Sequence, residues 1–199
     1  MTLSQVFTAP NQLTMLRMAF VPFIVIELVD GRYSWALLLF VVAGFSDGLD
    51  GLLARKLHQQ TLLGQYLDPI ADKLLLSTMF LVLSILRKIP WRFTVLVFSR
   101  DISILAASAV LFAIAGLRDF RPSIFGKANT FSQIAAVFFV MLLPLRPVRW
   151  IWITRTVFLR ATFAFTIISA LHYVFLVQHR LRAHAHSLAP PPSTNLAAS

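Results

Sequence analysis

The chain alternates between long apolar runs and short polar breaks, and this pattern restricts its fold more than any other feature of the sequence. Hydrophobic residues make up 58% of its 199 residues, and its mean hydropathy is +0.76. That composition is too apolar for an ordinary water-soluble domain and is typical of helices in a bilayer. The length leaves room for about six spans of roughly 20 residues each.

Breaks at proline and glycine residues separate six apolar segments, because helices tend to end at such residues. The segments are 12–30, 34–54, 67–86, 92–116, 127–145 and 151–178. We therefore expect an all-α, polytopic integral membrane protein with six transmembrane helices in one domain, residues 1–182. The tail 183–199 is poor in large apolar residues and is predicted to be disordered. The N-terminus lacks the features of a cleaved signal peptide, so the first segment is expected to remain a helix.

Charge and cysteine content exclude several function classes. The net charge is +10, but the basic residues flank apolar segments, which favours anionic lipid head groups over nucleic acid as partners. No cysteine is present, which excludes disulfides and thiolate chemistry. His184 and His186 lie in a tail that is expected to have no defined geometry, which argues against a metal site there.

Four aspartates cluster at the junction of the second and third segments: Asp47, Asp50, Asp68 and Asp72. Spacings of three and four residues place each pair on one helix face. Such a group of carboxylates at a membrane needs compensation, and Mg²⁺ or Mn²⁺ suits hard oxygen ligands. Two ions there would clamp the oxygens of a phosphoryl-type displacement. The alternative is that these carboxylates solvate helix ends and pair with nearby Arg and Lys residues.

Small and basic residues accompany the aspartates. Gly51 and Ala54 would let a nucleotide approach the backbone, and Arg55 offers donors suited to a diphosphate. Gly64 is expected in the turn between the two segments, with Pro69 near the start of the third helix.

The stretch from Asp47 to Asp72 resembles the signature of the CDP-alcohol phosphatidyltransferases, D-x-x-D-G-x-x-A-R-x8-G-x-x-x-D-x-x-x-D, and fills every fixed position. Similarity continues at 10–17, 99–101 and 126–130, and is closest to the phosphatidylglycerophosphate synthase and cardiolipin synthase branch. The resemblance implies six transmembrane helices, a homodimer, CDP-diacylglycerol as donor and release of CMP.

The resemblance also implies roles for individual residues. Asp47, Asp50 and Asp68 would bind one Mg²⁺, while Asp47, Asp68 and Asp72 would hold or border a second. Asp72 would also act as the general base. Gly51, Ala54 and Gly64 would line the cytidine site, and Arg55 would bind the diphosphate. Thr14 and Arg17 are either a nucleotide contact or an ordinary helix cap and interfacial anchor.

The acceptor site is expected around Arg100, which interrupts an apolar segment together with Asp101. The resemblance implies that Arg100 and Lys127 contact the acceptor phosphate, with Arg118 or Arg121 assisting. An Arg100–Asp101 structural pair is the alternative, weakened because adjacent helix residues do not face each other. Arg118 and Arg121 are explained equally well as head-group anchors.

The acceptor itself stays open between three compounds. Glycerol 3-phosphate is favoured, which would make the chain a phosphatidylglycerophosphate synthase. Asp101 and Asn129 instead favour phosphatidylglycerol and a cardiolipin synthase, and inositol phosphate is a third possibility. A non-enzymatic transporter is a different class, but no internal repeat is visible. An intramembrane prenyltransferase would need more helices.

Six spans would place both termini and the aspartates on one side of the membrane. The positive-inside bias is weak. We assign this side to the cytoplasm of a bacterial-type inner membrane because a nucleotide substrate occurs there. An apolar groove for acyl chains is expected, with a polar pocket above it.

Overall fold

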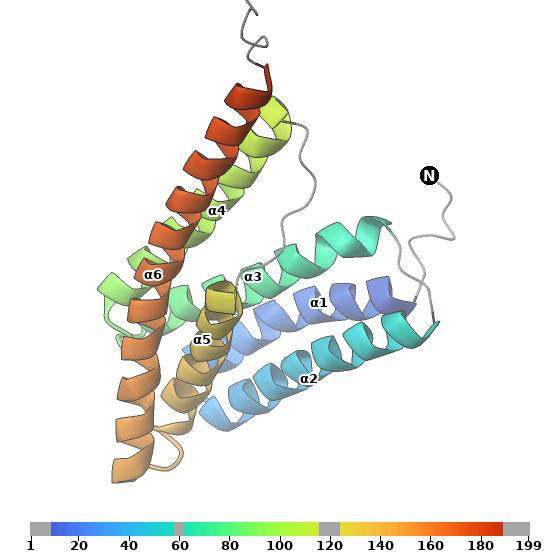
Figure 1. Ribbon diagram of the computed structural model, residues 1–199. Coiled ribbons are helices and arrows are strands. Elements are labelled where there is room, and N and C mark those ends of the chain that lie inside the picture. Colours follow the sequence, from blue (N-terminus) through green and yellow to red (C-terminus); the bar gives the residue numbers. More distant parts are fainter. Residues whose placement is uncertain (1–8, 58–61, 116–123, 189–199) are drawn as a thin grey trace, which may run out of the picture.

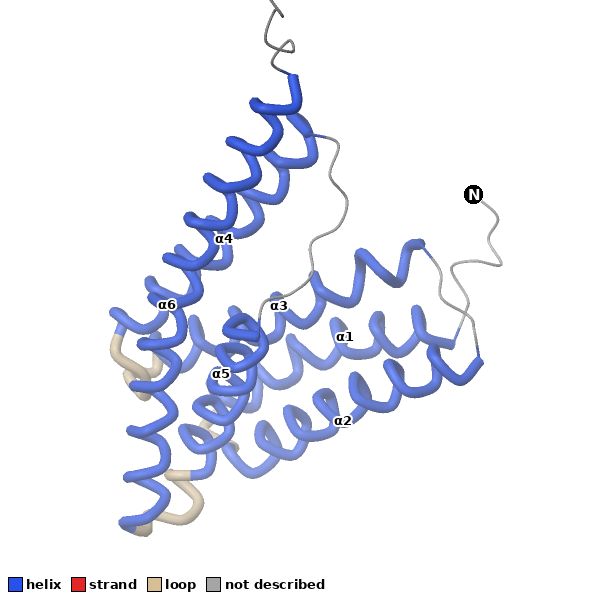
Figure 2. Tube along the Cα trace, viewed as in Figure 1, coloured by secondary structure: helices blue, strands red, loops and turns tan. Residues whose placement is uncertain are grey.

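The computed structural model describes residues 9–57, 62–115 and 124–188, with described side chains at 15–46, 73–103 and 126–171. These residues form six helices and no strand, as Figures 1 and 2 show. The helices are α1 (Ala9–Val29), α2 (Tyr33–Leu57), α3 (Leu62–Ile85), α4 (Trp91–Ala115), α5 (Ile124–Leu142) and α6 (Arg149–Leu188). The all-α prediction and the six apolar segments are confirmed as six helices.

Three connections follow from local sequence. Gly31 adopts a left-handed φ of 74° just after α1, a conformation that glycine takes without a steric penalty. Pro90 directly precedes α4, and Pro144 follows α5. Proline has no backbone N–H, so inside a helix it would remove a hydrogen bond, and at these positions it does not. The breaks predicted from proline and glycine therefore match the observed helix ends.

The start of α3 differs from the expectation. The helix begins at Leu62, so Gly64 lies inside α3 and not in the connecting turn, and Pro69 is well past the first turn. Leu62, Tyr66 and the residues beside them continue the apolar pattern at helical spacing, which extends the helix toward its N-terminus.

The end of α6 also lies beyond the predicted segment. This helix runs to Leu188 and takes in 183–188, while 189–199 lie outside the described residues. The boundary of the membrane domain and the disorder of the tail remain predictions.

One apolar core joins the helices. Helix α1 packs against α2 and α3, α5 packs against α6, α2 and α3, and α4 packs against α6 and α3. The core includes Ile24 and Leu28 of α1, Phe40 of α2, Met79 and Phe80 of α3, Val97 of α4, Val137 and Met141 of α5 and Leu159 of α6. Many large apolar side chains are exposed on the outside, such as Phe45 at 71% and Leu171 at 67%. Burial of one apolar face and exposure of the other suits helices surrounded by lipid.

Within the described residues, one helix segment is long and apolar enough to cross a membrane by itself, Arg149–Leu171 of α6. Tyr33–Ser46 and Lys73–Ile85 are shorter apolar segments. The number of helices therefore agrees with the expectation, whereas six membrane spans remain a proposal.

Candidate functional site

The four aspartates lie on two consecutive helices that meet at one end of the molecule. Asp47 and Asp50 belong to the C-terminal part of α2, and Asp68 and Asp72 to the N-terminal part of α3. Figure 1 shows these two helix ends near each other and near the start of α1, which carries Thr14. Gly51, Ala54 and Arg55 are in α2 and Gly64 is in α3. The side chains of all nine residues lie outside the described part, so their proposed contacts are untested.

A partly buried ionic network begins at Lys73, the residue after Asp72. Its Nζ donates a hydrogen bond of 2.7 Å to Oδ1 of Asp101 on α4. The same oxygen accepts a 2.7 Å bond from Nη1 of Arg100, and Nη2 of Arg100 donates to Oγ of Ser169 on α6 at 3.2 Å. This network connects the helix of Asp68 and Asp72 to α4 and α6.

Among the residues whose side chains are described, the network has an excess of positive charge. Arg100 is 7% exposed and Asp101 is 9% exposed, and two cations share one carboxylate. Nε of Arg100 is buried without a hydrogen-bond partner among the described residues. A buried cation that lacks full compensation is costly, so this position favours an additional anion. The phosphate of an acceptor has the required charge and acceptor oxygens.

The Arg100–Asp101 pair corrects one expectation. Neighbouring residues on a helix do not face each other, yet these two side chains are ion-paired. The long arginine side chain reaches around the helix, and burial of both groups makes pairing favourable. Pairing does not exclude ligand binding, because the Arg100 Nε has no described partner.

Within the part of the chain that it describes, the structure does not bring the other predicted acceptor residues together with Arg100. Lys127 lies in the first turn of α5 and is exposed. The described contacts do not link it to Arg100. Arg118 and Arg121 lie outside the described residues.

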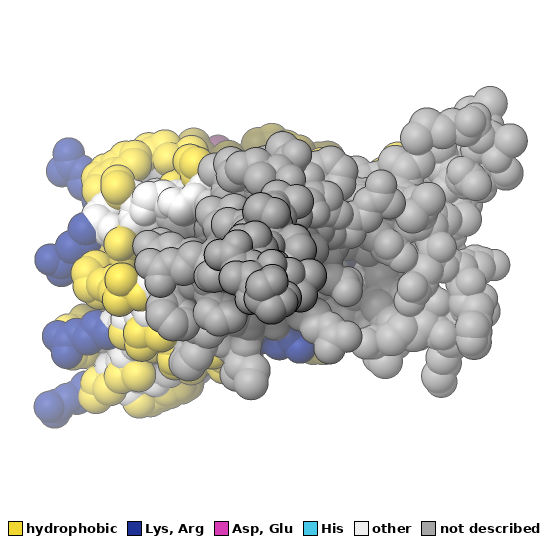
Figure 3. Space-filling view, turned by 45° about the horizontal axis from the view of Figure 1, so that its top comes forward, with side chains coloured by type: hydrophobic (Ala, Val, Ile, Leu, Met, Phe, Trp, Pro, Cys, Tyr) yellow, Lys and Arg dark blue, Asp and Glu magenta, His cyan; other side chains and the backbone are white. Residues whose placement is uncertain are grey.

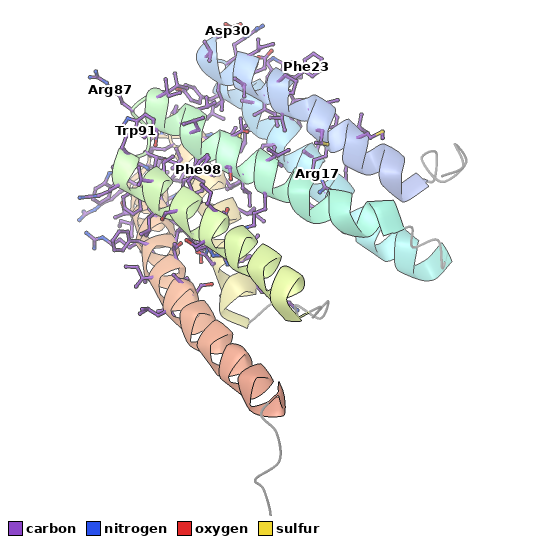
Figure 4. The ribbon with its side chains drawn as sticks, turned by 90° about the horizontal axis from the view of Figure 1, so that it is seen from above. Arg17, Phe23, Asp30, Arg87, Trp91 and Phe98 are labelled. Atoms are coloured by element: carbon purple, nitrogen blue, oxygen red, sulfur yellow. The ribbon has the colours of Figure 1, made fainter. Side chains whose placement is uncertain are left out.

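Arg17 is almost completely buried, although sequence alone left it between a site residue and an interfacial anchor. It is 1% exposed on α1, and Figure 4 shows it away from the outward-facing Phe23. It lines a cavity of about 440 Å³ whose other walls are apolar residues of α2, α3 and α5, among them Gly44, Leu76 and Phe138. Burial excludes a simple anchor at the membrane surface.

The same cavity is apolar, as a groove for acyl chains is expected to be, and its use by acyl chains remains a prediction. Gly44 and Phe45 line it and precede Asp47 on α2, while Leu75 and Leu76 line it and follow Asp72 on α3. The groove therefore lies directly beside the helix segments that carry the aspartates. Apolar walls with one cation suit a molecule with hydrocarbon chains and an anionic head.

Arg100 and Asp101 belong to a larger group of buried polar residues, of which Gln133, Thr162, Thr166 and Ser169 were not recognised from the sequence. We call it the polar seam: Arg100 and Asp101 of α4, Asn129 and Gln133 of α5, and Thr162, Thr166 and Ser169 of α6, all buried. Thr166 donates a 3.1 Å hydrogen bond to Oδ1 of Asn129. Asn129 and Gln133, like Thr162 and Thr166, are four residues apart, and this spacing was the signal that could have revealed the seam.

Comparisons with known proteins agree with the signature. The family model described as CDP-alcohol phosphatidyltransferase matches residues 7–184. A Mycobacterium tuberculosis protein named "Putative cardiolipin synthase" is 35% identical over 132 residues, 66% of this chain and 63% of that protein. A Bacillus subtilis protein named CDP-diacylglycerol–glycerol-3-phosphate 3-phosphatidyltransferase is 31% identical over 148 residues, 66% of this chain and 75% of that protein. Human cardiolipin synthase (CMP-forming) is 37% identical over 102 residues, which span 51% of this chain and 34% of the human protein.

Proposed function

Because the chain belongs to the CDP-alcohol phosphatidyltransferase family, we propose that it transfers a phosphatidyl group from CDP-diacylglycerol to glycerol 3-phosphate, releasing CMP. The observation that carries this proposal is the partly buried cationic network of Lys73, Asp101 and Arg100, which starts one residue after Asp72. It would hold an acceptor phosphate beside the general base.

The donor would lie across α2 and α3. Its acyl chains would occupy the apolar groove lined by Gly44, Phe45 and Leu76. Its cytidine would contact Thr14, Gly51, Ala54 and Gly64, with Arg55 on the diphosphate. Along α2 the groove residues come first, then Asp47 and Asp50, and then Gly51 and Ala54, which follows the order of chains, phosphates and nucleotide in the donor.

The family is membrane-bound and generally uses a divalent metal. Asp47, Asp50, Asp68 and Asp72 supply the hard carboxylate oxygens that Mg²⁺ or Mn²⁺ prefers, and we assign two ions to them. Bound ions would neutralise the diphosphate and stabilise CMP as leaving group.

The protein's own groups would carry out the remaining steps. Asp72 accepts the proton of the acceptor hydroxyl, whose oxygen attacks the phosphorus that carries diacylglycerol. The bond from that phosphorus to the oxygen bridging to CMP breaks, and CMP leaves with the electron pair. Arg100 fixes the acceptor, so much of the rate gain would come from positioning.

A cardiolipin synthase that uses phosphatidylglycerol is the second candidate. Asp101 after Arg100, Asn129 on α5 and the relatives named cardiolipin synthase favour it. Both acceptors present a hydroxyl and a phosphate, so the same cationic network would serve either one.

The arrangement in the membrane belongs to the same proposal. We assign six spans, a homodimer, and aspartates that face the cytoplasm of a bacterial-type inner membrane. CDP-diacylglycerol, a phosphate-bearing alcohol and membrane lipids are its partners, with no nucleic acid.

The test is CMP release by the purified protein from CDP-diacylglycerol with Mg²⁺, with glycerol 3-phosphate and phosphatidylglycerol offered separately and Asp72→Asn as the control. CMP with glycerol 3-phosphate supports the proposal. CMP with phosphatidylglycerol alone identifies a cardiolipin synthase. Absence of CMP with both acceptors, while a relative works in the same detergent, would contradict both assignments.

A further inference from the structure

A second cationic site lies at the opposite end of α3 from the aspartates. Asp72 and Arg87 are separated by fifteen residues, about 20 Å along a helix. Figure 4 shows Arg87 and Trp91 where α3 passes into α4, with Asp30 at the neighbouring turn. This region is therefore distinct from the proposed catalytic site.

Two adjacent hollows share the same three cations, Arg87, Lys88 and Arg155. One hollow of about 270 Å³ extends toward Val140, Leu143 and Pro144 of the α5 end. The other, of about 440 Å³, extends toward Ser84, Pro90 and Trp91. No acidic side chain is among the described residues that line either hollow.

The backbone holds these cations in place. Arg87 has a φ of 58°, a left-handed conformation that is unusual for a residue other than glycine. The turn is closed by bonds from the Lys88 N–H to the Leu83 carbonyl at 2.8 Å and from the Arg87 N–H to the Ser84 carbonyl at 3.0 Å. An arginine at a helix C-cap position where glycine is usual suggests that its side chain has a use there.

Arg155 adds a third cation from a different helix. Its Nη2 donates to the carbonyl oxygen of Lys88, which ties α6 to the α3–α4 turn. Its Nε is buried without a hydrogen-bond partner among the described residues. Lys88 in turn lies over the ring of Tyr33, with Nζ 5.4 Å from the ring centre. The cations are thus preorganised around an opening that no described acidic side chain lines.

The surroundings indicate a lipid more than a free ion. Trp91 is 53% exposed and lines one hollow, as expected of an aromatic ring at a membrane interface. Ile85 and Val95 nearby are 60% and 61% exposed. Figure 3 shows Lys and Arg side chains along one edge of the molecule beside hydrophobic ones. A ligand here meets phosphate-binding cations and lipid-facing side chains together.

We propose that Arg87, Lys88 and Arg155 form a binding site for the phosphate of an anionic membrane phospholipid, in the leaflet opposite the catalytic aspartates. The head-group phosphate would occupy the shared opening and the acyl chains would lie along the exposed apolar faces of α3 and α4. This site does not depend on the acceptor or on the proposed reaction.

Native mass spectrometry of the full chain from nonionic detergent tests the site, with phosphatidylserine and phosphatidylcholine as probes. The variant is R87Q/K88Q. Neither side chain donates a hydrogen bond among the described residues, so the fold should be retained. The matched control is R146Q/R149Q, which removes two exposed cations that line neither hollow.

We expect the unmodified chain to retain phosphatidylserine in preference to phosphatidylcholine. R87Q/K88Q should weaken phosphatidylserine binding by about 25-fold, about fivefold for each cation removed, and the control by less than about twofold. Asp72→Asn should retain the lipid, since the aspartates lie at the other end. Equal retention by both double variants would overturn the site, and displacement of the lipid by millimolar inorganic phosphate would overturn its assignment to a lipid.

Discussion

The helix bundle has two halves, α1–α3 and α4–α6, which differ in how many of the described polar side chains they bury. The buried side chains described in α1, α2 and the second half of α3 are mainly apolar, with Arg17 as the exception and Ser84 at the helix end. The facing surfaces of α4, α5 and α6 bury the polar seam in addition to apolar residues. Both halves belong to one bundle with a shared apolar core.

This difference indicates which part of the bundle binds a polar ligand. Apolar residues pack without a polar penalty, whereas each buried polar group needs a partner. In the polar seam, the Asn129 Nδ2, both Gln133 amide atoms and the Thr162 hydroxyl have no hydrogen-bond partner among the described residues. Retaining such groups suits a polar ligand, so we place the proposed acceptor at the polar seam and the proposed donor chains in the apolar groove between α2, α3 and α5. Four experiments test this division, in order of decreasing effect.

The largest effect is expected for Asp72→Asn. Loss of the general base should lower kcat by about 10²- to 10⁴-fold. CMP release at saturating donor and acceptor measures it, and Asp30→Asn, at an exposed ion pair with Arg32 in a distant turn, is the matched control. A variant that retains most of its activity would remove Asp72 from the chemistry.

The next largest effect is expected on the free energy of unfolding, which should differ between a variant in the apolar core and a variant in the polar seam. Phe80→Ala empties a fully buried position of the shared core and should lower the free energy of unfolding by about 3–5 kcal/mol. Gln133→Leu, also fully buried, removes amide atoms without a described partner and should be neutral or stabilising by about 1 kcal/mol.

Unfolding of both variants in mixed micelles by a denaturing detergent gives the comparison. Gln133→Leu should also lower CMP release, since its polarity serves binding and not stability. If Gln133→Leu lowers the free energy of unfolding as strongly as Phe80→Ala, the polar seam serves stability and not ligand binding.

Arg100→Gln should weaken binding of the acceptor and leave binding of the donor unchanged. Loss of its charge-assisted hydrogen bonds is worth about 1.5–3 kcal/mol, which raises the acceptor KM about 10- to 100-fold. The donor KM should change by less than about twofold. Arg100→Lys should restore part of the loss, and Arg92→Gln, an exposed arginine on the same helix, is the control. Equal changes in both KM values would indicate general damage to the fold.

The smallest effect is expected for Gly44→Leu. No atom lies within 4 Å of a Cβ built at Gly44, so the new side chain would enter the groove without disturbing the helix. It should raise the donor KM a few-fold, about 1 kcal/mol of lost chain contact. The effect should fade with short-chain donors. Val42→Leu, an exposed position outside the groove, should change nothing.

Much of this organisation could be predicted from the sequence. Apolar runs and proline breaks predicted the six helices, because helix formation in apolar segments depends on local sequence. The spacing from Asp47 to Asp72 located the candidate site at the junction of α2 and α3. The predicted groove is present beside it.

Long-range contacts could not be predicted in this way. The bond between Lys73 and Asp101 joins residues 28 positions apart, and the bond between Arg100 and Ser169 joins residues 69 positions apart. Hydropathy gives each helix a length but does not specify which polar faces meet. The position of Gly64 was wrong for a local reason, since helix α3 extends further than the turn signals indicated.

The most direct test of the division is to measure both KM values in Arg100→Gln and in Gly44→Leu, with CMP release as the readout. Our account predicts opposite patterns: Arg100→Gln raises the acceptor KM and leaves the donor KM unchanged, and Gly44→Leu does the reverse. Each variant serves as the control for the other. If both variants raise the same KM, or both KM values together, the donor and the acceptor do not occupy separate sites at the groove and the polar seam.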